Sequence, residues 1–233
     1  MKISSNKVST NALLVSVSAV IFAGINFTSL SAAEVLYSNV TSPTNEFLSL
    51  RNEVEFGDQA NFSPFLDAQT ITGFQFETFG DNLTQDTTAV IRFYNADSAT
   101  TMGVGALRLQ TMPFIIDTGY QTHSISGFSL DLDGLDSIIW TVTVEGIPQD
   151  GTVGLTLADP PSTGSSLNDY FESTSPGDPD QFVIKQFTDS QNVNFTAILE
   201  GDATAIVVPE PTTAALGVFG LATLLLRRSR RNH

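Results

Sequence analysis

The chain has 233 residues, of which 41% are hydrophobic and 17 are Phe, so it can form one domain with a real core plus appendages. All 25 acidic residues lie between Glu34 and Glu210, where only four of the ten basic residues are found, so this middle part carries a formal charge of about −21 against −15 for the whole chain. Such a negative field excludes nucleic acids and anionic lipid surfaces as partners, and the absence of Cys excludes disulfides, thiolate catalysis and Cys-based zinc sites.

The start of the chain, residues 1–33, has the pattern of a secretory signal peptide. Two lysines give it a positive beginning, Ala12–Ile25 is apolar, and the sequence Ser-Ala-Ala that ends at Ala33 is a small-x-small cleavage motif. We expect cleavage after Ala33 rather than a retained helical anchor, because the apolar stretch is short and small polar residues follow it. Residues 34–206 are then the exported domain.

Within this domain, short runs rich in Val, Ile, Thr and Phe alternate between apolar and polar residues and are separated by Gly, Asp, Asn and Pro, which is typical of β-strands. The clearest predicted strands are Thr70–Phe79, Thr88–Tyr94, Ser137–Glu145, Thr152–Leu157, Gln181–Phe187 and Asn192–Glu200, and weaker ones are Glu34–Val40, Gly105–Gln110 and Ser124–Leu132. The pattern predicts an all-β domain, a jelly-roll-like β-sandwich of about 8–10 strands.

Alternation also assigns side chains to faces of the strands. In Ser137–Glu145, Trp140 shares one face with Ile138, Val142 and Val144, so the single Trp is expected in the core rather than in an exposed sugar platform. The same rule gives these further core residues: Phe74, Phe76, Ile91, Phe93, Val153, Leu155, Leu157, Phe195, Ala197 and Leu199.

Catalytic residue patterns are scarce. After signal cleavage the domain holds one His, His123, which adjoins Ser124 at the start of a predicted strand, and there is no Gly-x-Ser-x-Gly motif. We therefore predict no enzyme and no cofactor, and interpret His123 as a surface residue. A carboxylate pair of the glycoside hydrolase type stays open, because the separation of acidic side chains cannot be inferred from this sequence.

The sequence DLDGLD at 131–136 suggests a calcium loop, since Asp131, Asp133 and Asp136 are hard oxygen ligands and Gly134 permits a tight turn. The further ligands of an EF-hand are missing. We favour a β-turn without metal, in which Leu130 and Leu132 face the core, the Asp residues face water and Gly134 turns the chain.

The longest weakly structured stretch is residues 158–181, with four Pro and five acidic residues, and is predicted to be a surface loop. Its Tyr170 and Phe171 are candidate contact residues for a carbohydrate ligand.

The chain ends with VPEP, fifteen uncharged residues and an Arg-rich tail. As a helix, Thr212–Leu226 would span roughly 22 Å, less than the roughly 30 Å of a bilayer core. Arg227, Arg228, Arg230 and Arg231 would nevertheless stop transfer and hold the tail on the cytoplasmic side.

These three parts of residues 207–233, together with a signal peptide, resemble the PEP-CTERM sorting signal of Gram-negative bacteria that make exopolysaccharide. The resemblance implies that Pro209, Glu210 and Pro211 are recognised by exosortase, a membrane protease-transpeptidase, that Thr212–Leu226 is a single membrane helix, and that the arginines are the stop. Two prolines would keep the motif extended and accessible at the membrane surface.

The exported domain also resembles a β-rich passenger module that recurs in PEP-CTERM proteins, in the sequences FQFETFG, TAVIRFYNAD, WTVTVEG and DPPSTGSSLNDYFE. This second resemblance supports the fold and implies no activity.

The sequence therefore predicts a non-enzymatic protein that the Sec machinery exports. It is inserted in the inner membrane transiently or permanently and sorted to the cell surface or extracellular matrix, with a structural or interaction role in the exopolysaccharide or biofilm envelope. A carbohydrate-binding module, with or without calcium, is the alternative, and a glycoside hydrolase is a minor one.

Overall fold

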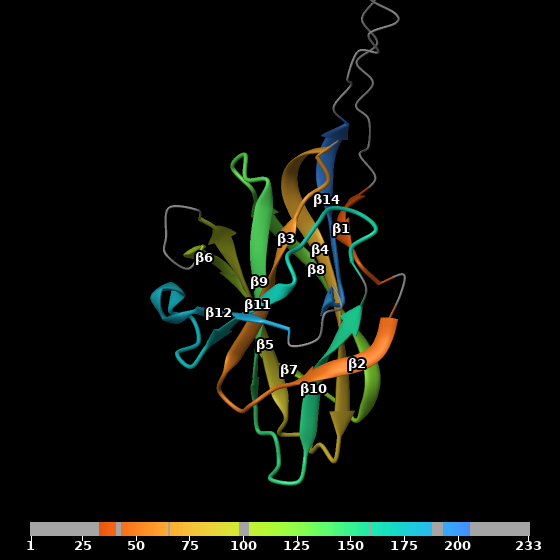
Figure 1. Ribbon diagram of the computed structural model, residues 1–233, viewed down its shortest axis with the longest axis vertical. Helices are drawn as coiled ribbons and strands as arrows, with labels where there is room; N and C mark the ends of the chain where they lie inside the picture. Colours follow the sequence, from red (N-terminus) through yellow and green to blue (C-terminus); the bar gives the residue numbers. More distant parts are fainter. Residues whose placement is uncertain are drawn as a thin grey trace, which may run out of the picture. The chain divides into compact units, whose positions relative to one another are not determined.

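The computed structural model of the protein describes residues 33–40, 43–64, 66–97, 103–158, 160–187 and 193–205. In this part the chain is all-β, and its strands form two antiparallel sheets of a β-sandwich with one core between them (Figure 1).

The first sheet, sheet A, has the order β1-β14-β4-β10-β13, with β2 on the other edge of β10 and β8 on the other edge of β4. Its strands are β1 (Glu34–Ser38), β2 (Pro43–Ser49), β4 (Leu66–Asp81), β8 (Gly119–Asp131), β10 (Thr152–Ala158), β13 (Asn194–Phe195) and β14 (Ala197–Ala205). The order across one end of this sheet is therefore β2, β10, β4, β8.

The second sheet, sheet B, has the order β12-β11-β3-β9-β5-β6, and the short β7 pairs with β5. Its strands are β3 (Glu55–Asn61), β5 (Thr88–Ala96), β6 (Val104–Gln110), β7 (Phe114–Ile115), β9 (Ser137–Glu145), β11 (Asp169–Ser173) and β12 (Val183–Gln186). A single 3-10 turn, η1 (Pro179–Gln181), lies between β11 and β12.

The nine predicted strands all correspond to strands of the structure, and Ser137–Glu145 has the same bounds in both. The described residues contain fourteen strands rather than about 8–10. The predicted strand Asn192–Glu200 covers both β13 and β14, and the unpredicted strands are β2, β3, β7 and β11. Each is very short or rich in Asn, Asp, Glu, Gly and Ser, so pairing with distant strands decides its conformation rather than local preference.

The face assignments are confirmed in the core. Trp140 is fully buried and its ring lies 5.1 Å from that of Phe74 and 6.1 Å from that of Phe195, so it joins the two sheets. All the other predicted core residues are buried as well.

The opposite face of β9 is also buried, which alternation alone does not predict. Thr141 and Thr143 are at most 2% exposed, because a second apolar cluster covers the outer face of sheet B. The members of this cluster are Tyr94, Val104, Ile139, Phe171 and Phe182.

The two ends of the described domain lie side by side. Glu34 of β1 pairs with Gly201 of β14, and Ala205 at the end of β14 pairs with Leu66 of β4 (Figure 1). Among the described residues no helix is long and apolar enough to cross a membrane, and the expected hydrophobic segments 12–25 and 212–226 lie outside them.

Candidate functional site

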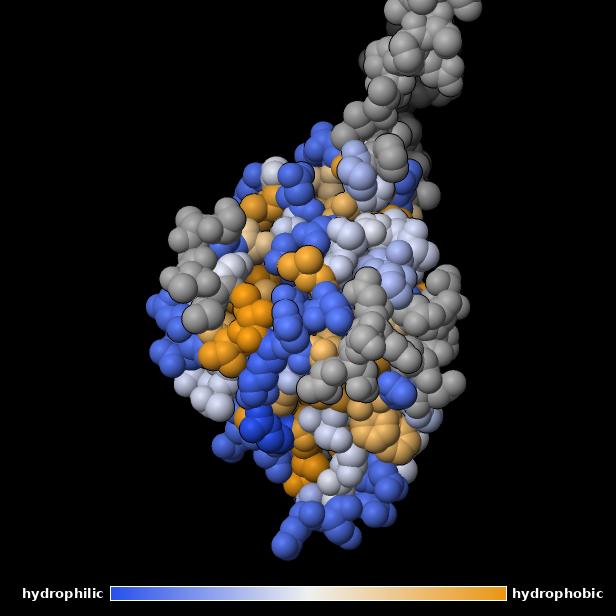
Figure 2. Space-filling model, viewed as in Figure 1, coloured by the Kyte–Doolittle hydropathy of each residue, from blue (hydrophilic) through white to orange (hydrophobic). Residues whose placement is uncertain are grey.

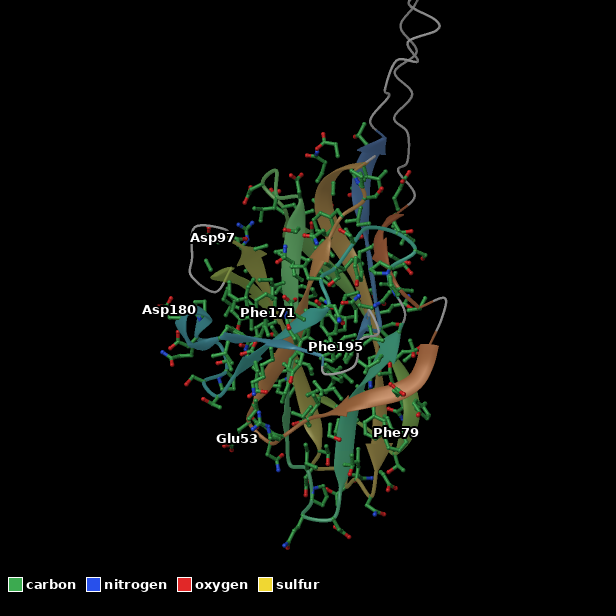
Figure 3. The ribbon with its side chains drawn as sticks, in the orientation of Figure 1. Glu53, Phe79, Asp97, Phe171, Asp180 and Phe195 are labelled. Carbon is green, nitrogen blue, oxygen red and sulfur yellow. The ribbon has the colours of Figure 1, made fainter. Side chains whose placement is uncertain are left out.

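Three aromatic side chains lie in a row across one end of sheet A, on its outer face. The ring centroids of Phe47 in β2 and Phe79 in β4 are 4.6 Å apart, and those of Phe79 and Tyr120 in β8 are 4.9 Å apart. None of the three belongs to the core, and Tyr120 is 58% exposed. Phe79 lies at the lower end of the sheet in Figure 3, and Figure 2 shows hydrophobic atoms at the surface beside β2. We call Phe47, Phe79 and Tyr120 the aromatic row.

The local sequence explains why these rings point outward. Phe74 and Phe76 of β4 face the core, and Phe79 is an odd number of residues further on, so it takes the opposite face. Gly154 of β10, which pairs with Phe79, leaves room for the ring of Phe47, because a Cβ there would come within 2.2 Å of Phe47 Cδ2.

Polar groups flank the aromatic row. Glu77 accepts long hydrogen bonds of 3.4 Å from the hydroxyls of Thr122 in β8 and Thr156 in β10, which lie on either side of this part of β4. Phe47 and Phe79 are half-buried and Tyr120 is exposed, so aromatic surface lies beside the Thr122 hydroxyl and the Glu77 carboxylate. This combination suits a ligand with apolar faces and polar edges, which is the chemistry of a sugar ring.

The aromatic row lies far from the end of the domain where β14 leaves it. Leu66, which pairs with Ala205, and Phe79 belong to the same strand and are separated along it by up to about 40 Å at the usual rise of a strand. A protein attached through its C-terminus would therefore present the row away from the attachment.

A groove with a volume of about 520 Å³ runs along β8, between this strand and the segment 111–114. It is lined by Thr111, Met112, Phe114, Thr122, His123, Ser124, Ile125 and Ser126. The His123 ring stacks on Phe76 with centroids 4.9 Å apart, and its Nε2 lies 2.8 Å from Thr78 Oγ1.

His123 therefore differs from its predicted setting. It is in the middle of β8 and partly buried, rather than at a strand start on the surface. Burial lowers its pKa, and the carboxylate of Asp117 only partly opposes this change. Neutral His123 serves as a hydrogen-bonding member of the packing.

Tyr170 and Phe171 lie in strand β11 rather than in a surface loop, so the loop prediction for residues 158–181 is wrong at these positions. Phe171 is 3% exposed and its ring packs against Phe182, and Tyr170 packs against the rings of Phe187 and Phe195. Neither ring offers a free face, because pairing of β11 with β3 and β12 draws both into the sandwich.

The DLDGLD segment forms the predicted turn. Asp133 and Gly134 have positive φ, and Leu130 and Leu132 are buried. Asp131 Oδ1 accepts the backbone N–H of Asp133, and Arg108 Nη2 lies 2.7 Å from Asp133 Oδ2. Asp131, Asp133 and Asp136 do not form a metal site: among the described residues no three His, Asp or Glu side chains are placed so that they could hold a metal ion.

Glu55 and Arg92 form a buried ion pair on the outer face of sheet B, beneath the second apolar cluster. Glu55 accepts hydrogen bonds from Tyr94 Oη at 2.9 Å, from the Thr141 hydroxyl, and from the backbone N–H of Gly177 at 2.8 Å. Arg92 Nη1 lies 3.7 Å from Glu55 Oε1. The hydrogen bonds to Glu55 compensate the cost of burying its charge. The hydrogen bond from Gly177 also attaches the segment after β11 to sheet B.

Asp58 is a second buried acid, on the inner face of β3. Its Oδ1 accepts hydrogen bonds from Ser166 Oγ at 2.8 Å and from the backbone N–H of Gln59 at 2.7 Å. Its Oδ2 and the Tyr37 hydroxyl are buried without a hydrogen-bond partner in the described part of the chain. Burial raises the pKa of Asp58 to about 8, with a smaller contribution from the charge of Asp169.

The sorting residues are outside the described part of the chain. This applies to Pro209, Glu210, Pro211 and the arginines at 227, 228, 230 and 231, whereas Ala33 is described and exposed just before β1.

The sequence contains a signal for part of the aromatic row. The parity of Phe79 relative to Phe74 and Phe76 already places it on the outer face. The proximity of Phe47 and Tyr120 had no such signal, since it depends on the order of four strands.

Comparison with models of known protein families finds none that matches the chain, and comparisons with curated proteins and with solved structures find no match either.

Proposed function

We propose that this chain is an exported, non-enzymatic protein of the bacterial cell surface whose domain binds exopolysaccharide through the aromatic row. The observation that carries the proposal is the row itself, three outward rings on one sheet face with centroids 4.6 and 4.9 Å apart. Contiguous apolar surface outside the core of a soluble domain is often a binding site.

The chemistry of the surface favours a neutral or weakly charged polysaccharide. The C–H groups of a sugar face carry partial positive charge and pack on the negative face of an aromatic ring. Glu77 and Thr122 supply hydrogen-bonding groups beside the rings. The strongly acidic domain would repel acidic polymers.

The proposed route of export rests on the signal peptide and the PEP-CTERM resemblance. In this proposal the Sec machinery exports the chain, the tail 212–226 holds it in the inner membrane, and exosortase recognises Pro209, Glu210 and Pro211. Attachment through the C-terminus would then leave the aromatic row facing outward.

We also propose that the sandwich is of the jelly-roll kind. The support is that the chain passes from one sheet to the other at most of its connections, for example from β3 to β4, β4 to β5 and β8 to β9.

Isothermal titration of the purified protein with exopolysaccharide from the producing bacterium tests the binding. We expect Phe79→Ala and Tyr120→Ala each to weaken binding at least about tenfold, because Phe79 is the middle ring of the row and Tyr120 its most exposed one. Phe114→Ala, which removes an aromatic ring from the His123 groove, is the control and should bind as the wild type does. Equal binding by the wild type and all three variants would rule out the aromatic row as the binding site.

The same titration with a chelator tests the calcium-assisted alternative. Binding through the row should be unchanged, whereas a loss on chelation would favour a metal-dependent site. Release of free sugar from the polysaccharide would contradict the non-enzymatic proposal.

Fractionation of cells with and without exosortase tests the sorting. We expect a shortened protein at the surface or in the medium only when exosortase is present. An uncleaved inner-membrane protein in both strains would refute processing while leaving the binding proposal to the titration.

A further inference from the structure

The edge strand β8 differs from every other edge strand of the described sheets. It has 13 residues, pairs with β4 on one side, and has no strand on its other side among the described residues. From Gly119 to Leu130 it has no Asp, Glu, Lys or Arg.

The other long edges carry the features that protect against pairing with another chain. Edge strands are commonly protected by charge, Pro or short length. Here β1 has Glu34, β2 has Pro43 and Glu46, β6 has Arg108 and β12 has Lys185. The remaining edge strands, β7 and β13, have two residues each.

The part of β8 suited to pairing is Gly119–Ser126. It pairs with β4 without a break from Gly80 to Gly73, and the irregularity of the strand comes after it, beyond Ser126. On the outer face of this stretch Tyr120 is the one large side chain, whereas Thr122, Ser124 and Ser126 are small, polar and exposed, so a second strand could approach closely along these three residues.

We propose that β8 is a self-association edge, at which two copies of this chain pair antiparallel about a two-fold axis. An edge without charge is the part of a strongly acidic molecule where a second copy meets least repulsion. Pairing of identical strands satisfies the outward backbone groups of both copies at once and gives a closed dimer.

The geometry of antiparallel pairing limits the registers. Residues opposite each other must face the same side of the sheet, so one residue of β8 lies opposite itself. The two registers that pair the most of Gly119–Ser126 place Thr122 opposite Thr122, or Thr122 opposite Ser124 of the second copy.

The two-fold axis is perpendicular to the sheet, so the outer faces of both copies lie on the same side of one continuous sheet. Two aromatic rows would then be available to one polymer, which would increase avidity. This consequence rests on the proposed function, whereas the dimer itself does not.

Cysteine cross-linking tests the pairing directly, since the chain has no Cys. We would oxidise Thr122→Cys alone, Ser124→Cys alone and a mixture of the two, in protein purified from producing cells. We expect a disulfide-linked dimer in high yield with Thr122→Cys alone or with the mixture. Gln186→Cys on the edge strand β12 is the control and should stay monomeric on a denaturing gel. Cross-linking no greater than in the control would overturn the proposal.

Sedimentation equilibrium without polysaccharide provides the second measurement. Ser124→Glu places like charges near the two-fold axis and should raise the dissociation constant at least about tenfold, whereas Gln186→Glu adds the same charge elsewhere and should not. A wild-type protein that is monomeric throughout the concentration series, or equal constants for the two variants, would refute the edge. Failure of polysaccharide binding would leave these results unchanged.

Discussion

At the scale of single residues, the strongest feature is a pair of buried acids that the fold treats differently. Glu55 has an arginine, two hydroxyls and a backbone N–H as partners, so its charge is compensated. Asp58 has hydrogen bonds to one oxygen only, and burial raises its pKa. We therefore expect opposite changes in the free energy of unfolding when each acid is replaced by an uncharged residue.

For Asp58 we predict that stability falls as pH rises from about 4 to about 8. The folded pKa of about 8 lies above the ordinary value, so in this range the folded state holds a proton that the unfolded state has lost. The slope from this group is at most about 1.4 kcal/mol per pH unit. Asp58→Asn should remove this slope and be more stable than wild type at pH 8, as measured by urea unfolding across the pH range.

The control for this prediction is Asp180→Asn, which changes an exposed acid and should keep the slope. His123 has a lowered pKa and adds a change of opposite sign at lower pH. It is present in every variant, so it cancels in the difference curves. Parallel curves for wild type and Asp58→Asn would contradict the assignment.

For Glu55 we predict the reverse. Glu55→Ala leaves the buried charge of Arg92 without its carboxylate, and loss of one member of a buried pair costs about 3–5 kcal/mol of stability. Amide exchange at Gly177 should become faster, since its N–H loses its acceptor. Lys185→Ala breaks a partly exposed pair with Glu172 and should cost about 1 kcal/mol or less. Equal losses for both variants would contradict this account.

At the scale of elements, the sequence predicts those strands whose pattern is set by residues adjacent along the chain. Trp140 and the other inward residues of β9 follow from alternation alone. The burial of Thr141 on the opposite face does not, because Phe182, which covers that face, comes from a distant segment. For the same reason the local sequence does not predict β11 or the burial of Phe171.

The candidate site shows the same division. The outward direction of Phe79 could be predicted from its parity in β4, but not that β10 separates β4 from β2 and so places Phe47 beside it. The order of strands is set by long-range pairing and packing, which no local pattern encodes.

The contact between β10 and β2 gives a prediction at this scale. Gly154→Ala places a Cβ where the ring of Phe47 lies, so the ring must move off the aromatic row. We expect weaker polysaccharide binding and a stability loss of about 1–3 kcal/mol. Titration and urea unfolding of Gly154→Ala, Phe47→Ala and the double variant give a cycle. If Gly154 acts through Phe47, the double variant should bind no worse than Phe47→Ala, and additive losses would contradict this.

At the scale of the whole molecule, the position of the aromatic row relative to the chain ends matters for a surface protein. Both ends of the described domain lie together, with Glu34 paired to Gly201, while the row lies at the other end of sheet A. In Figure 3 Phe79 is at the lower end and β14 ends at the top. A domain attached through its C-terminus would thus expose the row to the surrounding matrix.

Oriented immobilisation tests this arrangement. The chain has no Cys, so a single Cys can be placed either near the end of β14 or beside the aromatic row. Thr204→Cys, exposed near the end of β14, should attach the protein with the aromatic row outward and keep its capacity for exopolysaccharide on a sensor surface. Ser49→Cys, exposed in β2 and paired with Gly154, should attach it with the row against the surface and lose most of that capacity.

Both variants should bind alike in solution, so that any difference on the sensor comes from orientation. The comparison also separates the aromatic row from a site elsewhere on the domain. A binding surface near the end of β14 would give the opposite order of capacities. Equal capacities would mean that the polymer binds to a surface that is near neither attachment point. Only the order expected here, high for Thr204→Cys and low for Ser49→Cys, agrees with a polymer that binds at the far end of sheet A.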